Sequence, residues 1–292
     1  MRAKVYFIFD KIVKSRHSRE NGNPENSNYM KILDSCLRRN DRKLPFQTFY
    51  ETIIFTLILF FAFSAGCGGD RRSSKPDSGR DFKVMREKMV ETQIKGRGVK
   101  NERVLSAMLK VERHRFVPKQ YESQAYADQP LPIGEGQTIS QPYIVALMTE
   151  LLDLKGEETV LEVGTGSGYQ AAILAELAKE VYTIEIVEPL ASSSKTLLFE
   201  LGYRNIQVKA GDGYLGWPDV APFDAIIVTC APDHIPKPLL EQLKEGGRLV
   251  VPVGTHSQEL KRIVKRSGKI ETTDVIPVIF VPMTGDGVKH KK

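Results

Sequence analysis

Residues 160–170 read VLEVGTGSGYQ, and this segment carries the strongest indication of the fold. Strand-forming residues and an acidic residue precede glycines at three alternate positions, Gly164, Gly166 and Gly168. Such a turn joins a buried parallel strand to a helix and lets a ligand approach the backbone, because glycine has no Cβ. A dinucleotide fingerprint has the spacing G-x-G-x-x-G, whereas the third glycine here comes one residue earlier. The shorter spacing favours a smaller ligand without phosphate groups, and a turn that binds no ligand is the alternative.

A second acidic position follows at the distance that a doubly wound fold requires. The run VYTIEI covers residues 181–186, and Glu185 lies about 20 residues beyond the glycine turn. Its carboxylate can accept hydrogen bonds from both hydroxyls of a ribose, and a solvent-exposed glutamate at a strand end is the simpler alternative. Asp212, in AGDGY, follows a third apolar run and suits either recognition of an adenine edge or a tight turn. Turn and spacing together favour a nucleoside site.

Alternating strand and helix patterns from Thr159 onward predict an α/β fold. The expected strands cover residues 159–163, 181–186, 206–210, 224–229, 247–253, about 260–266 and about 275–281. The expected helices lie near residues 168–178, 188–201 and 236–244, and Gly246 and Gly247 end the last one. Apolar strands that alternate with helices form a doubly wound, mostly parallel sheet with helices on both faces. Ligands bind beyond the carboxyl ends of such strands, where the glycine turn, Glu185 and Asp212 converge.

The chain divides into two parts of different composition. Residues 1–81 contain 15 Lys and Arg against 9 Asp and Glu, and residues 82–292 contain 27 of each, so the net charge of +6 belongs to the first part. We therefore expect no nucleic-acid partner for the second part. Residues 82–292 hold a single cysteine, Cys230, which excludes a disulfide framework and a cysteine-based metal site there. The histidines are scattered without ligand spacing, so we expect no metal. From Phe82 apolar residues repeat at helical spacing, and Asn101 is placed to cap a second helix, which predicts an N-terminal helical cap.

Residues 1–81 are expected to be a non-globular extension. Residues 15–43 are polar and resemble translated intergenic repeats of bacterial genomes, so the true start can lie downstream, with Met30 as a candidate. An apolar segment at 52–66 suits the core of a signal peptide, and it ends in Ser64-Ala65-Gly66-Cys67, which resembles a bacterial lipoprotein box with serine in place of the usual leucine. A Gly/Ser/Pro/Arg linker follows. The alternative to a lipoprotein signal, which we weigh equally, is a mis-assigned translation start joined to an accidental apolar run.

The segment before the first expected strand carries a more specific signal. Residues 125–145 read AYADQPLPIGEGQTISQPYIV, in which prolines and glycines predict a rigid loop followed by a helix. This string resembles the protein-L-isoaspartate O-methyltransferases. Further strings resemble the same family in the same order: MVETQIKGRGV (89–99), RHRFVP (113–118), VLEVGTGSGYQAAILAEL (160–177), VYTIEI, LGYRNIQVKAGDGYLGWP (201–218), APFDAIIVT (221–229) and QLKEGGRLVVPVG (242–254). The resemblance covers about residues 82–286, which we take as the methyltransferase domain, 82–292, and it implies a seven-stranded, Rossmann-like sheet.

The resemblance also implies an activity and a set of site residues. The activity is methyl transfer from S-adenosyl-L-methionine to the free carboxylate of L-isoaspartyl residues in damaged proteins and peptides, which starts their repair. The serine of the TIS motif, Ser140, corresponds to the active-site residue. The implied cofactor contacts are Thr138, Ile139, Ser140, Glu162, Gly164, Thr165, Gly166, Gly168, Glu185, Asp212, Gly213, Gln258 and Thr284.

Elementary chemistry suits these residue types. A carboxylate substrate with a pKa of about 3.5–4 is ionised at neutral pH, so the reaction needs neither a general base nor a metal. Ser140 can orient the carboxylate, and its alternative role is to cap the helix that begins near Pro142. His114 could serve as an acid or base, but a structural histidine in the helical cap is the better account.

Two other functions and two locations stay open at this point. The chain could methylate a different carboxylate substrate, or it could be an inactive, lipid-anchored binding protein of the same fold. Because S-adenosylmethionine is made in the cytoplasm, we expect a cytoplasmic catalytic domain. A membrane-anchored lipoprotein is the alternative, in which the chain meets the membrane only if the N-terminal segment is retained or Cys67 is lipidated.

Overall fold

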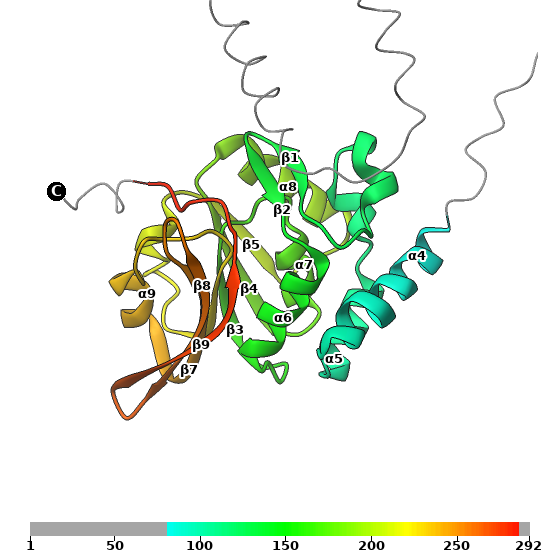
Figure 1. The fold of residues 1–292 in the computed structure, drawn as a ribbon. Coiled ribbons are helices and arrows are strands. Elements are labelled where there is room, and N and C mark those ends of the chain that lie inside the picture. The colour runs from blue at the N-terminus through cyan, green and yellow to red at the C-terminus, as the bar shows by residue number, and fades with distance from the viewer. Residues whose placement is uncertain (1–80, 286–292) are drawn as a thin grey trace, which may run out of the picture. The chain divides into compact units, whose positions relative to one another are not determined.

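The computed structural model describes residues 81–285, and its centre is a mixed sheet (Figure 1). The sheet order is β5-β4-β3-β6-β7-β8-β9. Pairs from β5 to β7 are parallel, whereas β8 pairs antiparallel with both β7 and β9. The strands are β3 (Thr159–Val163), β4 (Glu180–Glu185), β5 (Ile206–Ala210), β6 (Phe223–Val228), β7 (Leu243–Val253), β8 (Gln258–Arg266) and β9 (Lys269–Val278). This arrangement confirms the predicted mostly parallel, seven-stranded, doubly wound sheet.

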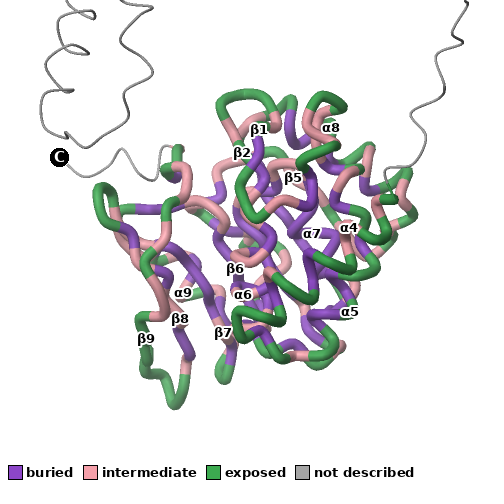
Figure 2. Tube along the Cα trace, turned by 45° about the vertical axis from the view of Figure 1, so that its right-hand side comes forward, coloured by how far each residue is buried: buried purple, intermediate pink, exposed green. Residues whose placement is uncertain are grey.

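Helices cover both faces of the sheet. They are α6 (Pro142–Leu152), α7 (Tyr169–Ala175), α8 (Glu188–Glu200) and α9 (Lys237–Glu241). Alternate residues of the central strands point to opposite faces, so Val160 packs in the cluster that includes α6 and α7, and Leu161 packs in the cluster that includes α9. Figure 2 shows the central strands and α7 as mostly buried chain, whereas β9 at the sheet edge is mostly exposed. The strand order reverses at β3, which is the topological position where open α/β sheets bind ligands.

The predicted N-terminal cap is present on the α7 side of the sheet. It contains α4 (Phe82–Lys88), a π-helical turn (Met89–Ile94), a 3-10 turn (Lys95–Arg97) and α5 (Glu102–Lys110). Asn101 caps α5 as expected, because its side chain accepts hydrogen bonds from the backbone N–H groups of Arg103 and Val104 at 3.0 and 3.4 Å. The apolar face of α5 is buried against α6 and α7 and joins the cap to the main core.

Two predicted boundaries near the C-terminus are wrong. Gly246 and Gly247 do not end a helix, because α9 stops at Glu241 and both glycines lie within β7. The pairing register of β6 with β7 shifts between Phe223 and Ala225, so the glycines belong to a bulge rather than a helix end. The last strand lies earlier than predicted, at Lys269–Val278, because exposed polar residues without an apolar pattern pair with β8 across a tight turn.

The loop predicted between residues 125 and 145 contains a small hairpin. Strands β1 (Leu131–Gly134) and β2 (Gln137–Ile139) pair antiparallel around Glu135 and Gly136, which have φ values of 53° and 69°. The hairpin ends one residue before Ser140 and holds the TIS motif in an extended form.

The N-terminal predictions lie almost entirely outside the described residues. The extension up to residue 80, the apolar segment at 52–66 and Cys67 belong to this undescribed part. Among the helices of residues 81–285, none is long and apolar enough to cross a membrane.

Candidate active site

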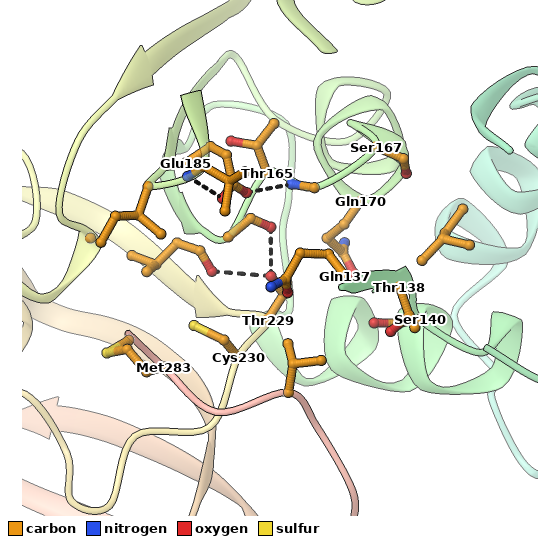
Figure 3. A pocket seen from close by; sticks show the side chains of 18 of the residues that line it. Gln137, Thr138, Ser140, Thr165, Ser167, Gln170, Glu185, Thr229, Cys230 and Met283 are labelled. Carbon is orange, nitrogen blue, oxygen red and sulfur yellow. Dashed lines mark hydrogen bonds between the residues drawn. The ribbon is translucent and has the colours of Figure 1, made fainter. Parts of the chain in front are cut away.

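A cavity lies at the carboxyl ends of the central parallel strands (Figure 3). Its walls come from the end of β2, the glycine turn after β3, the end of β4, the residues after β6 and a segment at 281–284. Figure 3 shows Glu185 and Thr165 on one side and Thr138 and Ser140 on the other, with Cys230 and Met283 along a third. Of the predicted site residues, the cavity is lined by Thr138, Ile139, Ser140, Gly164, Thr165, Gly166, Glu185, Gly213 and Thr284.

The glycine turn needs glycine for both conformation and space. Gly164, Gly166 and Gly168 have φ values of 99°, 52° and 86°, a region that other residues seldom adopt. A Cβ at Gly164 would also collide with Oγ1 of Thr229. That hydroxyl donates a hydrogen bond of 2.6 Å to the Gly164 carbonyl, so the turn is fastened to the end of β6. The turn therefore presents backbone rather than side chains to a ligand.

Glu185 braces the glycine turn from the neighbouring strand. Its two carboxylate oxygens accept hydrogen bonds from the N–H groups of Gly166 at 2.8 Å and Val187 at 2.9 Å, and the residue is 5% exposed. Both bonds hold the carboxylate at the end of β4, on the cavity wall. This is the position predicted for the ribose-binding residue.

Glu162 lies behind the turn rather than in the cavity. It is fully buried, and its Oε2 accepts a hydrogen bond of 2.6 Å from Thr183, whose hydroxyl also contacts that of Thr165 at 2.6 Å. Burial raises the pKa of Glu162 to about 8, and its Oε1 has no hydrogen-bond partner within the described residues. Glu162 therefore reaches the cavity only through Thr183 and Thr165.

Ser140 lies where two cavities meet. A second cavity of about 600 Å³ is lined by the 276–281 segment on one side and by the cap and α6 on the other. The two cavities share Thr138, Ser140, Thr229 and Val281. The structure does not show the alternative capping role of Ser140, because Gln141 is the N-cap of α6 and no side chain of the described residues makes a capping hydrogen bond there. Within residues 81–285 the Ser140 hydroxyl makes no hydrogen bond, so it is available at this junction.

Three other predicted contacts support the cavity from outside its lining. Gly168 is the N-cap residue of α7 and packs on Leu198. Asp212 accepts a hydrogen bond of 2.9 Å from the N–H of Tyr214, as expected for a tight turn, and lies against Gly285. Gln258 forms two hydrogen bonds with the backbone of Phe280, at 2.6 and 3.1 Å. Gln258 thus holds the chain just before the 281–284 segment.

That segment supplies three site residues that were not predicted, Val281, Pro282 and Met283, beside the predicted Thr284. The N–H of Ala231 donates to the Val281 carbonyl and the N–H of Met283 donates to the Ala231 carbonyl, both at 2.8 Å, which places 281–284 against the end of β6. Thr229 and Cys230 line the same wall. Burial raises the pKa of the Cys230 thiol to about 12, so it is neutral at physiological pH. The signal available for Thr229 and Cys230 is their place at the end of the predicted parallel strand 224–229.

The electrostatics of the first cavity are simple. Among residues 81–285, Glu185 is the only acidic residue that lines it, and none of their lysines, arginines or histidines does. His114 lies in the cap, where it stacks on Phe82 and its Nδ1 contacts the Tyr126 hydroxyl at 2.8 Å, so it is a structural histidine. Residues 81–285 contain no group of three or more His, Cys, Asp or Glu that could hold a metal ion. A ligand with a positive charge and a ribose suits this cavity better than one with phosphates.

Comparison with known proteins is consistent with this geometry. The family model described as protein-L-isoaspartate(D-aspartate) O-methyltransferase matches residues 84–288. A protein-L-isoaspartate O-methyltransferase of Opitutus terrae is 58% identical over 201 residues, which cover 68% of this chain and 86% of the relative. One from Shewanella sediminis, named protein-L-isoaspartate O-methyltransferase 2, is 57% identical over 206 residues, which cover 70% of this chain and 84% of the relative.

Solved structures show the same relationship. A protein-L-isoaspartate O-methyltransferase structure has a TM-score of 0.64 at 31% identity and covers 70% of this chain and 67% of its own. A putative protein-L-isoaspartate O-methyltransferase from Plasmodium falciparum, in complex with S-adenosyl-L-homocysteine, has a TM-score of 0.61 at 26% identity, with coverage of 68% and 98%. The chain belongs to the protein-L-isoaspartate(D-aspartate) O-methyltransferase family.

Proposed function

We propose that this protein transfers a methyl group from S-adenosyl-L-methionine to the free carboxylate of L-isoaspartyl residues in damaged proteins and peptides. The observation that carries the proposal is that Ser140 stands at the junction of two cavities. One is a nucleoside-type cavity at the glycine turn, and the other is a larger groove that opens beside it. A cofactor in the first and a peptide in the second would meet at Ser140.

The residues of the first cavity fit this cofactor. Glu185 lines the cavity and would accept hydrogen bonds from ribose hydroxyls, and the glycine turn would let the ligand approach the backbone of Gly164 and Gly166. Thr138, Ile139, Ser140, Thr165, Gly213 and Thr284 would form the rest of the contact surface. Glu162, Gly168, Asp212 and Gln258 would support it by holding the turns and the 281–284 segment. Within the described part of the chain no basic side chain lines the cavity, which suits the sulfonium of S-adenosylmethionine, and this cofactor supplies an electrophilic methyl group when bound.

The chain's own contribution to the reaction is alignment. The acceptor carboxylate is already ionised at neutral pH, so no residue has to remove a proton. The Ser140 hydroxyl can donate a hydrogen bond to one carboxylate oxygen and hold the other in line with the methyl group, and such positioning supplies much of the rate. Ile139, Val145 and Val281 line the cavity near Ser140 and limit water, which favours a step in which opposite charges neutralise one another.

Two peptides that differ only in one linkage test the proposal. The full chain is incubated with methyl-labelled S-adenosylmethionine and either an isoaspartyl peptide or its aspartyl twin, and the initial rates are compared. We expect rapid labelling of the isoaspartyl peptide and little of the twin. Equal rates would indicate a different carboxylate substrate, and cofactor binding without transfer to either peptide would indicate a binding protein.

We also propose that the methyltransferase domain acts in the cytoplasm, because the reaction needs a cofactor made there. A membrane-anchored form through Cys67 is the alternative. Intact-mass measurement of the protein from its native host separates the two. An unlipidated chain that starts downstream of the repeat-like residues supports a cytoplasmic enzyme, whereas a chain that begins at Cys67 with added acyl mass contradicts it.

A further inference from the structure

A fully buried arginine holds the backbone at Ser140. Arg113 begins the 3-10 turn Arg113–Phe116 of the cap, and the residue is 0% exposed. Its Nε donates a hydrogen bond of 2.7 Å to the carbonyl oxygen of Ala125, and its Nη2 donates another of 2.7 Å to the carbonyl oxygen of Ser140. The guanidinium therefore ties the helical cap to the residue at the junction of the two cavities.

The same guanidinium also contacts the helix that follows the glycine turn. Its central carbon lies 4.8 Å from the centroid of the Tyr169 ring. Tyr169 is the first residue of α7, directly after Gly168, and it is buried. The fixed, diverging N–H groups of a guanidinium can hold two carbonyls while its plane rests on a ring, which a lysine ammonium cannot do. One side chain thus connects the Ser140 segment to the cofactor side of the site.

A cation at this position is costly for folding. Burial lowers the pKa of Arg113 to about 10, and no carboxylate within residues 81–285 forms an ion pair with it. An apolar side chain of similar volume would fill the space without the desolvation cost of a buried charge. The two carbonyl bonds and the ring of Tyr169 stabilise the charge instead. The arginine is thus suited to holding a backbone position rather than to filling the core.

We propose that Arg113 is a positioning residue for methyl transfer, which fixes the place from which the Ser140 side chain reaches the junction by holding the Ser140 carbonyl. This inference rests on the proposed function of Ser140. Within the described residues the hydroxyl has no hydrogen bond of its own, so its reach depends on where the backbone holds the Cα–Cβ bond of Ser140 (Figure 3). Arg113 lines neither cavity, so its effect has to pass through the residues that it holds.

Two substitutions of Arg113 and one matched control test this role in the full chain. Arg113→Lys keeps the charge but loses the diverging N–H groups of the guanidinium. Arg113→Met removes the buried charge and serves if the lysine variant does not fold. Arg248→Lys is the control, because the Nε and Nη2 atoms of Arg248 donate to the carbonyls of Leu152 and Asp153 at 2.7 and 2.8 Å, at the opposite end of α6. Methylation kinetics, the unfolding midpoint and binding of S-adenosyl-L-homocysteine are measured for each variant.

We expect both Arg113 variants to lower kcat for the isoaspartyl peptide on the order of 10- to 100-fold, since small misplacements of reacting groups have effects of this size. The KM for S-adenosylmethionine should stay within about threefold of the wild-type value. Arg248→Lys should lower the unfolding midpoint and leave kcat near wild type. A wild-type kcat in a folded Arg113 variant, or an equal loss in the Arg248 control, would overturn the inference.

A double-mutant cycle tests whether the effect passes through the hydroxyl. In a Ser140→Ala background, Arg113→Lys should change kcat by less than about threefold, because the group that it positions is gone. A full loss in both backgrounds would refute the coupling. Hydrogen exchange gives a readout that needs no activity: amides at 137–141 should exchange faster in Arg113→Lys than in Arg248→Lys. An inactive wild type would refute the proposed function, whereas unchanged exchange at 137–141 would refute the role of Arg113.

Discussion

Replacing Glu162 by glutamine should change how the stability of the protein depends on pH. In the folded protein burial raises the pKa of Glu162 to about 8, from an ordinary value of 4.5. The unfolded chain therefore binds fewer protons than the folded one between these two values. The stability that the protonated carboxyl contributes is complete below about pH 4.5 and is lost as the pH rises towards 8.

The size of the effect follows from the same two pKa values. Each pH unit between them changes the free energy of unfolding by about 1.4 kcal/mol. Relative to Glu162→Gln, the free energy of unfolding of the wild type should therefore fall by roughly 3 kcal/mol by pH 7 and by roughly 5 kcal/mol above pH 8. The glutamine keeps a carbonyl oxygen that can accept from Thr183, as Oε2 of Glu162 does at 2.6 Å. The glutamine does not ionise, so the free energy of unfolding of Glu162→Gln should not fall with pH in this way.

Urea unfolding of the wild type, Glu162→Gln and Glu200→Gln measures how the free energy of unfolding of each protein changes with pH. The two pKa values set a measuring range of about pH 5 to 9. Glu200 is an exposed glutamate on α8 and serves as the control. Comparing each variant with the wild type removes the contribution of all other titrating groups. Parallel curves for the wild type and Glu162→Gln across this range would show that Glu162 is ionised in the folded protein and would refute the account.

Three further substitutions separate binding, catalysis and turn geometry. Ser140→Ala should lower kcat and leave the affinity for S-adenosyl-L-homocysteine near wild type in calorimetry, and lost affinity would contradict an orienting role. Glu185→Ala should weaken that affinity by roughly 2–3 kcal/mol, because a charged acceptor is lost, and unchanged binding would exclude the ribose role. Gly164→Ala should lower the free energy of unfolding on the order of 1–3 kcal/mol, since its φ of 99° is strained for alanine and the new Cβ meets Thr229. Thr229→Ala in that background should restore part of the loss, and no recovery in urea unfolding would refute the steric explanation.

The sequence predicts the part of the site that depends on local spacing. The glycine turn and Glu185 follow from short-range constraints, namely positive φ values at alternate glycines and a carboxylate at the end of the next strand. Asn101 and the α5 helix were predicted for the same reason, because a cap and an apolar period are local features. These features keep their meaning whatever the rest of the chain does.

Long-range pairing is what the sequence did not reveal. Residues 281–283 enter the site because Ala231 forms backbone hydrogen bonds with Val281 and Met283, and no local sequence pattern predicts that contact. Gly246 and Gly247 look like a helix end, yet the β6–β7 register places them in a bulge. Arg113 has no local pattern that marks it as buried, and only the fold brings Ser140 to its guanidinium.

The central claim is that this chain methylates isoaspartyl carboxylates selectively, and a competition experiment tests it most directly. The full chain is given S-adenosylmethionine and an equimolar mixture of an isoaspartyl peptide and its isotopically marked aspartyl twin, and both are followed by mass spectrometry. The account predicts that the isoaspartyl peptide gains the mass of one methyl ester and then loses methanol to form a succinimide, while the twin stays unmodified. Methylation of both peptides at equal rates would contradict it.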